Sequence, residues 1–310
     1  MILTVTANTT FDQTLFVPYL ALNRTIRASR TVQSMGGKPT DASWILGRLG
    51  IPSLALGFAA GDYGKKIRSM LHSRGVVTDF IEVGGESRLN TVIVVEDGSG
   101  QITITTNTLA VAPEHLIELR RRYEMALDKT SVVVLGGTLP QGTQPAMYTE
   151  LIGIARQRNI PVIFDADEPN LSAGLQSRPT YIKPNQHELE ALTGHPIPDV
   201  QAAYAAGRQL LETYGTCPII TMGVEGGLVV LPDRAYFIPS IRVEVASASG
   251  AGDAILAGLA ASIDRQQPVE EGLRLGFAAA TAVVLMPGTA DCRPEDVERF
   301  LPQIKLIPYP

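Results

Sequence analysis

The sequence predicts an α/β fold of three layers, in which helices cover both faces of a mostly parallel central sheet. Short apolar runs rich in β-branched residues alternate with longer runs of helical periodicity over most of the chain. Runs that are apolar at almost every position are typical of strands buried on both faces of a parallel sheet. The length of 310 residues suits one large core, and we expect a single domain over residues 1–310.

Five runs have the composition of buried strands. They are Ile2–Ala7, Ser131–Gly136, Pro161–Ala166, Pro218–Met222 and Gly227–Leu231. Helical runs lie between them, and the clearest is Pro113–Leu127, which opens with Pro and Glu as a helix N-terminus often does. The other expected helices are Asp41–Leu49, Pro145–Arg158, Val200–Tyr214, Ala251–Ile263 and Val269–Leu285.

One region departs from this alternation and predicts a small antiparallel unit. Residues 91–106 contain two strand-like arms, Val92–Val95 and Gln101–Thr106, around a turn rich in Gly and acidic residues. In the second arm Ile and Thr alternate, which is typical of a half-exposed strand. Residues 14–17 and 26–32 are candidate partners for this hairpin.

Composition argues against several classes of protein. Hydrophobic residues make up 45% and charged residues 18% of the chain, as in an ordinary soluble enzyme. A net charge of −5 gives no general attraction to nucleic acid or to an anionic membrane. No apolar run approaches the roughly 20 residues of a membrane span, and the chain opens as a strand without a basic leader. We therefore expect a cytoplasmic protein, with Cys217 and Cys292 as core thiols.

The run Ala246–Gly258 carries the clearest chemical signal. Residues 249–252 have little or no side chain, so their backbone N–H groups can approach a ligand closely. The apolar helix that follows directs its positive end to the same place and favours bound negative charge. Asp253 stands in the first helical turn, where it could take the proton of a hydroxyl during phosphoryl transfer. The alternative is an ordinary strand-to-helix turn with an acidic first-turn residue.

Six motifs together resemble the PfkB (ribokinase-like) carbohydrate kinases, and within them the branch of 1-phosphofructokinase and tagatose-6-phosphate kinase. The motifs stand in the family's order and are spread over most of the chain. They are Met1–Asp12, Gly36-Gly37-Lys38, Gly136–Pro140, Lys183–Glu188, Thr221–Gly226 and Ala246–Gly258. The chain has neither a P-loop motif nor a GxGxxG after its first strand, so a nucleotide must be held in another way.

The resemblance implies a ribokinase-like fold and an ATP-dependent kinase that uses Mg²⁺ and phosphorylates a hydroxyl of a sugar phosphate. Asp253 matches the family's base, and the cradle of the transferring phosphoryl group is matched by Gly250, Ala251 and Gly252. Nucleotide contacts are implied for Asn185, Thr221, Gly223, Gly226 and Ser249, and Mg²⁺ contacts for Asn185 and Glu188. Asn185 and Glu188 also have the spacing of a helix capping box, and both roles can hold together.

The resemblance also implies a site for the acceptor sugar. Its residues are Asp12, Gly37, Lys38, Asp41, Arg88 and Asn90. The Asp12 carboxylate could accept bonds from sugar hydroxyls, and Lys38 could pair with a substrate phosphate. A β lid over the sugar is implied, with strands drawn from about 12–34 and 88–108, and the resemblance implies a homodimer formed through that lid.

Two residues depart from the family's GGKGxN motif. Pro39 replaces Gly and is expected to push Lys38 out of the helical region. Asp41 replaces Asn with an acceptor-only negative group, which would repel a sugar phosphate unless a cation lies between them. Three interpretations stay open: a kinase of a sugar phosphate, a kinase of an unphosphorylated sugar or nucleoside, and a non-catalytic regulator that binds sugar or nucleotide. Asp253 argues against the regulator, because a sensor needs no proton acceptor.

Overall fold

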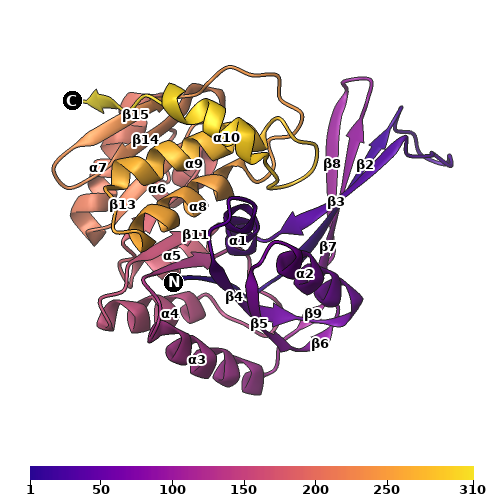
Figure 1. The fold of residues 1–310 in the computed structure, drawn as a ribbon, viewed down its shortest axis with the longest axis horizontal. Coiled ribbons are helices and arrows are strands. Elements are labelled where there is room, and N and C mark those ends of the chain that lie inside the picture. The colour runs from indigo at the N-terminus through magenta and orange to yellow at the C-terminus, as the bar shows by residue number, and fades with distance from the viewer.

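The computed structural model describes all 310 residues and contains a central sheet of ten strands (Figure 1). Its strand order is β16-β15-β14-β13-β12-β11-β10-β1-β4-β5. The strands from β13 to β5 pair in parallel, and β14 to β16 add an antiparallel edge. The bounds are β1 (Ile2–Thr6), β4 (Ser53–Ala59), β5 (Val77–Glu82), β10 (Val132–Gly136), β11 (Val162–Asp165), β12 (Tyr181–Ile182), β13 (Cys217–Thr221), β14 (Gly226–Val230), β15 (Ala235–Pro239) and β16 (Ile307–Tyr309). The predicted α/β class with a mostly parallel sheet is confirmed.

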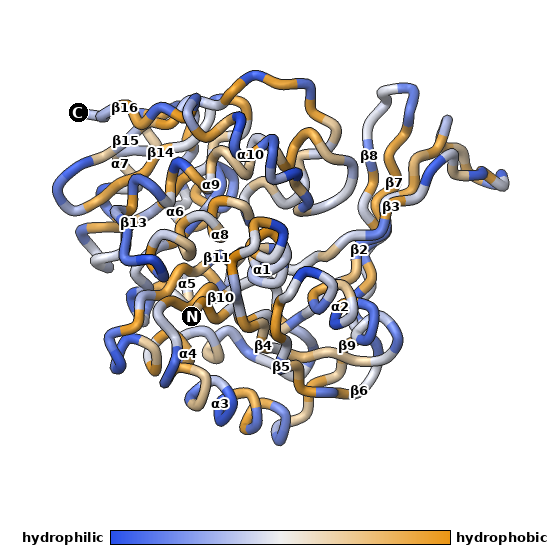
Figure 2. The backbone as a smooth tube through the Cα atoms, in the orientation of Figure 1, coloured by the Kyte–Doolittle hydropathy of each residue, from blue (hydrophilic) through white to orange (hydrophobic).

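Alternate residues of one strand pack into opposite hydrophobic cores. In β1, Ile2 belongs to one core and Leu3 to the other, and Val132 and Val133 of β10 repeat this division. The first core is closed by α1 (Lys38–Arg48), α2 (Gly61–Ser73), α8 (Ala251–Asp264), α9 (Val269–Val283) and α10 (Pro294–Phe300). The second is closed by α3 (Pro113–Leu127), α4 (Ala146–Gln157), α5 (Asn170–Leu175), α6 (Gln186–Thr193) and α7 (Val200–Tyr214). Helices on both faces explain why these strands are apolar throughout, as the colours of β10 and β11 in Figure 2 show.

Helix α8 is buried along most of its length against the sheet and α9. A Cβ on Gly258 of α8 would lie 2.2 Å from the backbone nitrogen of Gly276 in α9, so the two helices meet closely at a pair of glycines. This contact helps to fix the N-terminus of α8, the end that carries Asp253.

A second sheet rises from the body of the molecule at the upper right of Figure 1. It has the order β3 (Arg30–Gly36), β2 (Thr10–Val17), β7 (Arg88–Val95) and β8 (Gly100–Thr105), in which β2 and β7 are parallel and the outer pairs antiparallel. We call this sheet the lid sheet. The half-exposed pattern expected for residues 101–106 is wrong for β8, because all six of its residues are exposed and no helix covers either face. A further pair joins β6 (Gly84–Gly85) to β9 (Leu109–Ala110).

Helix α1 begins earlier than expected. The sequence predicted a helix over 41–49 with Lys38 outside it, but α1 starts at Lys38, so the expected effect of Pro39 is wrong. A proline in the first turn is tolerated, because the N–H that it lacks would have no helical partner there. The expectation from sequence also left out β4, α2 and β5, which fill residues 53–82.

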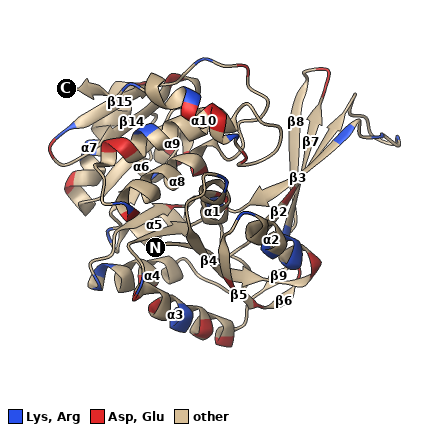
Figure 3. Cartoon of the chain, in the orientation of Figure 1, with Lys and Arg blue, Asp and Glu red and all other residues tan.

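The charged residues lie mainly on the outer elements. Figure 3 shows Lys, Arg, Asp and Glu on α3 and α10, whereas the central strands carry few charges. No helix combines the length and the apolar composition that crossing a membrane requires.

Candidate active site

Polar residues gather where the parallel strands end. Asp165 closes β11, Lys183 follows β12, and Thr221 closes β13. In open α/β sheets, ligands bind at this carboxyl edge. The N-terminus of α8 points to the same edge, because Gly252 in its first turn lies against the ammonium group of Lys183.

Asp253 and Asp41 are two buried acids that meet at this edge. Each lies in the first turn of its helix, α8 or α1, and both side chains are buried. Burial raises the pKa of Asp253 to about 7, and the nearby charge of Asp165 adds to this effect. Burial and the charges of Asp253 and Asp12 hold the pKa of Asp41 well above its usual range.

The turn before Asp253 has the shape of an anion cradle. Gly250 caps α8 with a φ of 84°, and a Cβ there would lie 2.3 Å from the backbone nitrogen of Ala290. The N–H groups of Asp253 and Ala254 bond to the carbonyl of Gly250, so the turn is tight. A Cβ on Gly252 would lie 2.9 Å from Nζ of Lys183, so a cation stands directly beside the first-turn N–H groups.

Lys38 and Lys183 hold a network of acids next to the cradle. Nζ of Lys38 lies 2.9 Å from Oδ1 of Asp165, 2.8 Å from Oδ1 of Asp167 and 2.9 Å from Oε1 of Glu188. Lys183 forms a second ion pair with Asp165, at 3.0 Å. Burial alone would lower the pKa of Lys38, but the three carboxylates outweigh it and raise that pKa well above the usual range. Asp165 and Asp167 were missed as site residues; the only sequence signal is their position at the end of an apolar strand run.

Asn185 and Glu188 form the capping box that their spacing predicted. The N–H of Glu188 donates to Oδ1 of Asn185 at 2.9 Å, and the N–H of Asn185 donates to Oε2 of Glu188 at 2.8 Å. The second oxygen of Glu188 is free of the cap and bonds to Lys38. The cap therefore leaves one carboxylate oxygen facing the acid network.

The oxygen donors around Lys38 fit Mg²⁺ bound together with phosphates. No group of three His, Cys, Asp or Glu side chains forms a ready metal cage. Magnesium takes few direct carboxylates and keeps waters and phosphate oxygens in its shell. Glu188, Asp165 and Asp167 each place a carboxylate oxygen within about 3 Å of the Lys38 ammonium group, so oxygen donors for a metal that arrives with a nucleotide lie beside that cation.

Three of the residues expected to contact a nucleotide lie at the end of β13 or just after it. Thr221 ends β13 and bridges to Asn185, so the two lie side by side. Gly223 begins a 3₁₀ turn over Gly223–Glu225, and Gly226 follows with a φ of 113°. A Cβ on Gly226 would lie 2.0 Å from the carbonyl oxygen of Ile238, so close packing against β15 is enough to require glycine there.

Several of the residues expected to hold the acceptor sugar meet at the base of the lid sheet. Asp12 accepts from Nδ2 of Asn90 at 2.9 Å and from the hydroxyl of Thr289 at 2.7 Å. Burial raises the pKa of Asp12 to about 6, against the lowering effect of these two bonds and of the Arg88 charge. Gly37 caps α1 with a φ of 99°. The charges of Asp12 and Arg88 both act on Asp41, so this group of residues lies near the buried acid of α1.

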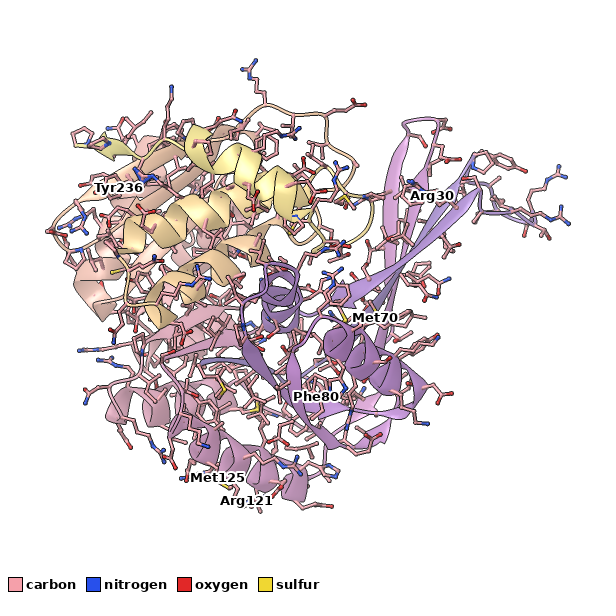
Figure 4. All side chains as sticks on the ribbon, viewed as in Figure 1. Arg30, Met70, Phe80, Arg121, Met125 and Tyr236 are labelled. Carbon is pink, nitrogen blue, oxygen red and sulfur yellow. The ribbon has the colours of Figure 1, made fainter.

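Arg88 is a half-buried cation on this side. Its guanidinium donates to Thr10 Oγ1 at 2.9 Å and to Thr138 Oγ1 at 3.1 Å. Burial lowers the pKa of Arg88, and among the nearby acids Asp12 and Asp41 oppose this effect most strongly. Arg30 lies further out on the lid sheet (Figure 4), where its guanidinium stacks 3.9 Å from the ring centroid of Phe16.

Thr289 joins the two halves of the site, and sequence reasoning missed it. Its hydroxyl contacts both Asp12 and Ser249, the latter at 3.1 Å, and its N–H donates to Ser34 of β3. A cleft between the lid sheet and residues 246–249 opens beside it. Thr289 lies in a loop far along the chain with no motif around it, so no local pattern could have placed it.

Comparisons with known proteins agree with this arrangement. The model of the pfkB family carbohydrate kinases matches residues 3–296. The chain is 29% identical to a 1-phosphofructokinase of Bacillus subtilis over 99% of both chains. It is 26% identical to a tagatose-6-phosphate kinase of Staphylococcus epidermidis, also over 99% of both. A structure described as a possible 1-phosphofructokinase of Thermotoga maritima superposes with a TM-score of 0.89 at 26% identity, covering 100% of this chain and 99% of the other.

Proposed function

The chain belongs to the pfkB family of carbohydrate kinases, and on that premise we propose that it transfers the γ-phosphoryl group of ATP to a hydroxyl of a sugar phosphate. The observation that carries the proposal is the position of Asp253, buried in the first turn of α8 beside the cradle and Lys183. Relatives named 1-phosphofructokinase and tagatose-6-phosphate kinase support a sugar phosphate as the acceptor.

In this mechanism the nucleotide phosphates lie at the N-terminus of α8. The N–H groups of Gly250, Ala251 and Gly252 and the ammonium of Lys183 face the transferring phosphoryl group and hold its charge. Ser249, Thr221, Gly223 and Gly226 complete the nucleotide side. Glu188 and Asn185, with Asp165 and Asp167, would hold Mg²⁺, which neutralises phosphate charge when bound.

The acceptor hydroxyl lies between the cradle and the lid sheet. Asp12 and Asn90 hold sugar hydroxyls, and the guanidinium of Arg88 provides positive charge for the substrate phosphate. Asp253 takes the hydroxyl proton as the O–P bond forms and ADP leaves. Lys38 is committed to the acids of the nucleotide side, so Arg88 is the better placed cation for the acceptor.

Acceptor-dependent formation of ADP tests the proposal. The purified protein is assayed with ATP and Mg²⁺ against fructose 1-phosphate, fructose 6-phosphate, tagatose 6-phosphate and unphosphorylated fructose. We expect ADP only with a sugar phosphate. Turnover only with the unphosphorylated sugar would replace the proposal with the second interpretation. Absence of turnover, with a sugar that still raises the Tm, would favour the regulator.

A substitution of Asp253 tests its role as the base. Asp253→Asn should retain ATP binding and lose kcat by about 10²–10⁴-fold, because the general base is removed. Asp62→Asn, an exposed acid of α2, is the matched control and should retain full activity. Near-full kcat in Asp253→Asn would rule out Asp253 as the base.

We also propose that two copies of the chain pair through their lid sheets. Strand β8 is exposed at every position, and Ile102 and Ile104 are 44% and 56% exposed on it. An exposed apolar strand is covered in stable proteins, and a second copy of the same sheet offers a matching surface. Ile104→Lys should then give a monomer in light scattering, whereas Ile117→Lys, at a 70% exposed position of α3, should not. A wild-type monomer would contradict this pairing.

A further inference from the structure

Thr289 makes hydrogen bonds to both sides of the cleft beside the lid sheet. Its hydroxyl donates to Oδ2 of Asp12 at 2.7 Å, and Oγ of Ser249 lies 3.1 Å from the same hydroxyl oxygen. Its N–H donates to Oγ of Ser34 in β3 at 3.1 Å. Asp12, Ser34 and Thr289 are each 4% exposed, so water competes little for these bonds.

The protons of these bonds have one arrangement when Asp12 is ionised. A carboxylate accepts hydrogen bonds and donates none, so the single proton of the Thr289 hydroxyl is used on Asp12. The bond between Thr289 and Ser249 then needs the Ser249 hydroxyl as its donor. Thr289 has no proton left to donate to a bound sugar, and its hydroxyl meets the acceptor side of the site at Asp12.

The loop that carries this hydroxyl is fixed from the body of the molecule. We call residues 288–292, which lie between α9 and α10, the strap. The N–H of Ala290 donates to the carbonyl of Ser249 at 3.1 Å. Nη2 of Arg74 lies 3.0 and 3.1 Å from the two carboxylate oxygens of Asp291. The strap therefore holds its side chains in place before any ligand binds.

We propose that Thr289 is a positioning residue, which holds the carboxylate of Asp12 in the orientation that binds the hydroxyls of the acceptor sugar. Asn90 of β7 donates to Oδ1 of Asp12 at 2.9 Å, and Thr289 of the strap donates to Oδ2. A carboxylate held by two separate elements has less freedom to lose when a ligand binds. The inference rests on the proposed function of Asp12 as a ligand of the sugar.

Two substitutions at Thr289 separate its hydroxyl from its bulk. Thr289→Val removes the hydroxyl and keeps the volume, and we expect KM for the acceptor to rise about 10-fold. Thr289→Ser keeps the hydroxyl and should restore most of the affinity. In both variants kcat and KM for ATP should change by less than about twofold, because Asp12 holds the sugar equally before and during transfer.

Thr149→Val is the matched control, because Thr149 is a half-buried residue of α4 whose hydroxyl bonds to the carbonyl of Ala173. Its kinetics should equal those of wild type. An unchanged acceptor KM in Thr289→Val would overturn the proposal. A fall in kcat at unchanged KM would also overturn it, since Thr289 would then act on the reacting atoms.

A double-mutant cycle shows whether Thr289 acts through Asp12. Asp12→Ala should raise the acceptor KM by more than Thr289→Val does. The double variant should have a KM close to that of Asp12→Ala alone, because Thr289 then has no carboxylate to hold. If the two increases multiply, Thr289 acts by another route and the proposal fails. Thermal melting of each variant checks that it is folded.

The acceptors in these assays are fructose 1-phosphate, tagatose 6-phosphate and unphosphorylated fructose, because all three offer hydroxyls to Asp12. Turnover with fructose alone would overturn the proposed sugar phosphate, while a raised KM for fructose in Thr289→Val would still support the positioning role.

Stability against pH gives a readout that needs no turnover. The Thr289 bond lowers the pKa of Asp12, so its loss should move the Asp12-dependent fall in stability to higher pH. Urea titrations of Thr289→Val, with and without Asp12→Asn, measure that midpoint. If no acceptor is turned over, the proposed function fails and this titration decides: an upward shift supports the positioning role, and an unchanged midpoint overturns it.

Discussion

Nζ of Lys38 lies 2.9 Å from Oε1 of Glu188. The sequence assigned these residues to different ligands, Lys38 to the acceptor and Glu188 to Mg²⁺, yet one bond joins them. Lys38 therefore stands at the boundary between the two halves of the site, and its charge is shared with Asp165 and Asp167. This position changes what its substitution should do.

Replacement of Lys38 by Met should destabilise the protein and increase its response to Mg²⁺. The change leaves Asp165, which is almost fully buried, with Lys183 as its single partner. Breaking a buried pair costs about 3 kcal/mol, so the Tm should fall by several degrees. A divalent cation can then bind among the same oxygens, so millimolar Mg²⁺ should raise the Tm more than in wild type.

Lys65→Met is the control for this substitution, because the ion pair of Lys65 with Asp62 is exposed and of little value. The Tm of Lys65→Met should equal that of wild type, both in the absence and in the presence of Mg²⁺. Equal Mg²⁺ responses of wild type and Lys38→Met would mean that Lys38 and the metal do not share these oxygens.

Replacement of Arg88 by Met should weaken the binding of the acceptor and spare that of ATP. The substitution keeps part of the apolar stem and removes the half-buried cation at the base of the lid sheet. A hydrogen bond to a charged group contributes about 1.5–3 kcal/mol, so KM for a sugar phosphate should rise about 10- to 100-fold. The measurement is KM for both substrates at two salt concentrations, with Arg120→Met on exposed α3 as the control. A rise in KM for ATP alone would mean that Arg88 acts on the nucleotide and not on the acceptor.

The raised pKa of Asp12 predicts how stability depends on pH. Its pKa of about 6 in the folded protein lies above the unfolded value of 3.8. Between these values the folded state holds the proton and the unfolded state does not, so this contribution is complete below about pH 3.8 and is lost as pH rises through about 6.

Asp12→Asn removes that dependence. From pH 5 to pH 8 the free energy of unfolding should fall by about 1 kcal/mol less in Asp12→Asn than in wild type. Urea titrations at the two pH values measure this difference, and Asp62→Asn, an exposed acid, should behave as wild type. The same slope in wild type and Asp12→Asn would show that Asp12 is ionised throughout this range.

Local patterns predicted those parts of the site whose residues lie within one helical turn of each other in the sequence. The Asn185–Glu188 cap and the first-turn position of Asp253 are examples, because both follow from spacing along a helix. The bond between Lys38 and Asp165 spans 127 residues, and no spacing rule reaches that far. Asp165 also stands at the end of an apolar run. The composition of that run indicates a buried strand, and nothing in it indicates that the last residue belongs to a site. Asp41 and Asp253 stand in the first turns of two helices that are distant in sequence and packed together, so the departure from the family's Asn could be noticed but not explained.

Two alanine substitutions in the cradle should separate its folding role from its chemical role. In Gly250→Ala the new Cβ would lie 2.3 Å from the backbone of Ala290, and the φ of 84° is strained for any residue with a Cβ. This variant should lose stability by several kcal/mol. In Gly252→Ala the Cβ would lie 2.9 Å from Nζ of Lys183, the flexible end of a side chain.

Gly252→Ala should lose less stability than Gly250→Ala, because the end of the Lys183 side chain can shift, at the cost of a longer ion pair with Asp165. The displaced ammonium and the added methyl group both lie where the transferring phosphoryl group is expected. We expect kcat to fall by about 10²-fold or more, as when one donor to developing charge is lost. Calorimetry and steady-state kinetics on both variants give the comparison. A fully active Gly252→Ala would mean that the phosphoryl group is held elsewhere than at the N-terminus of α8.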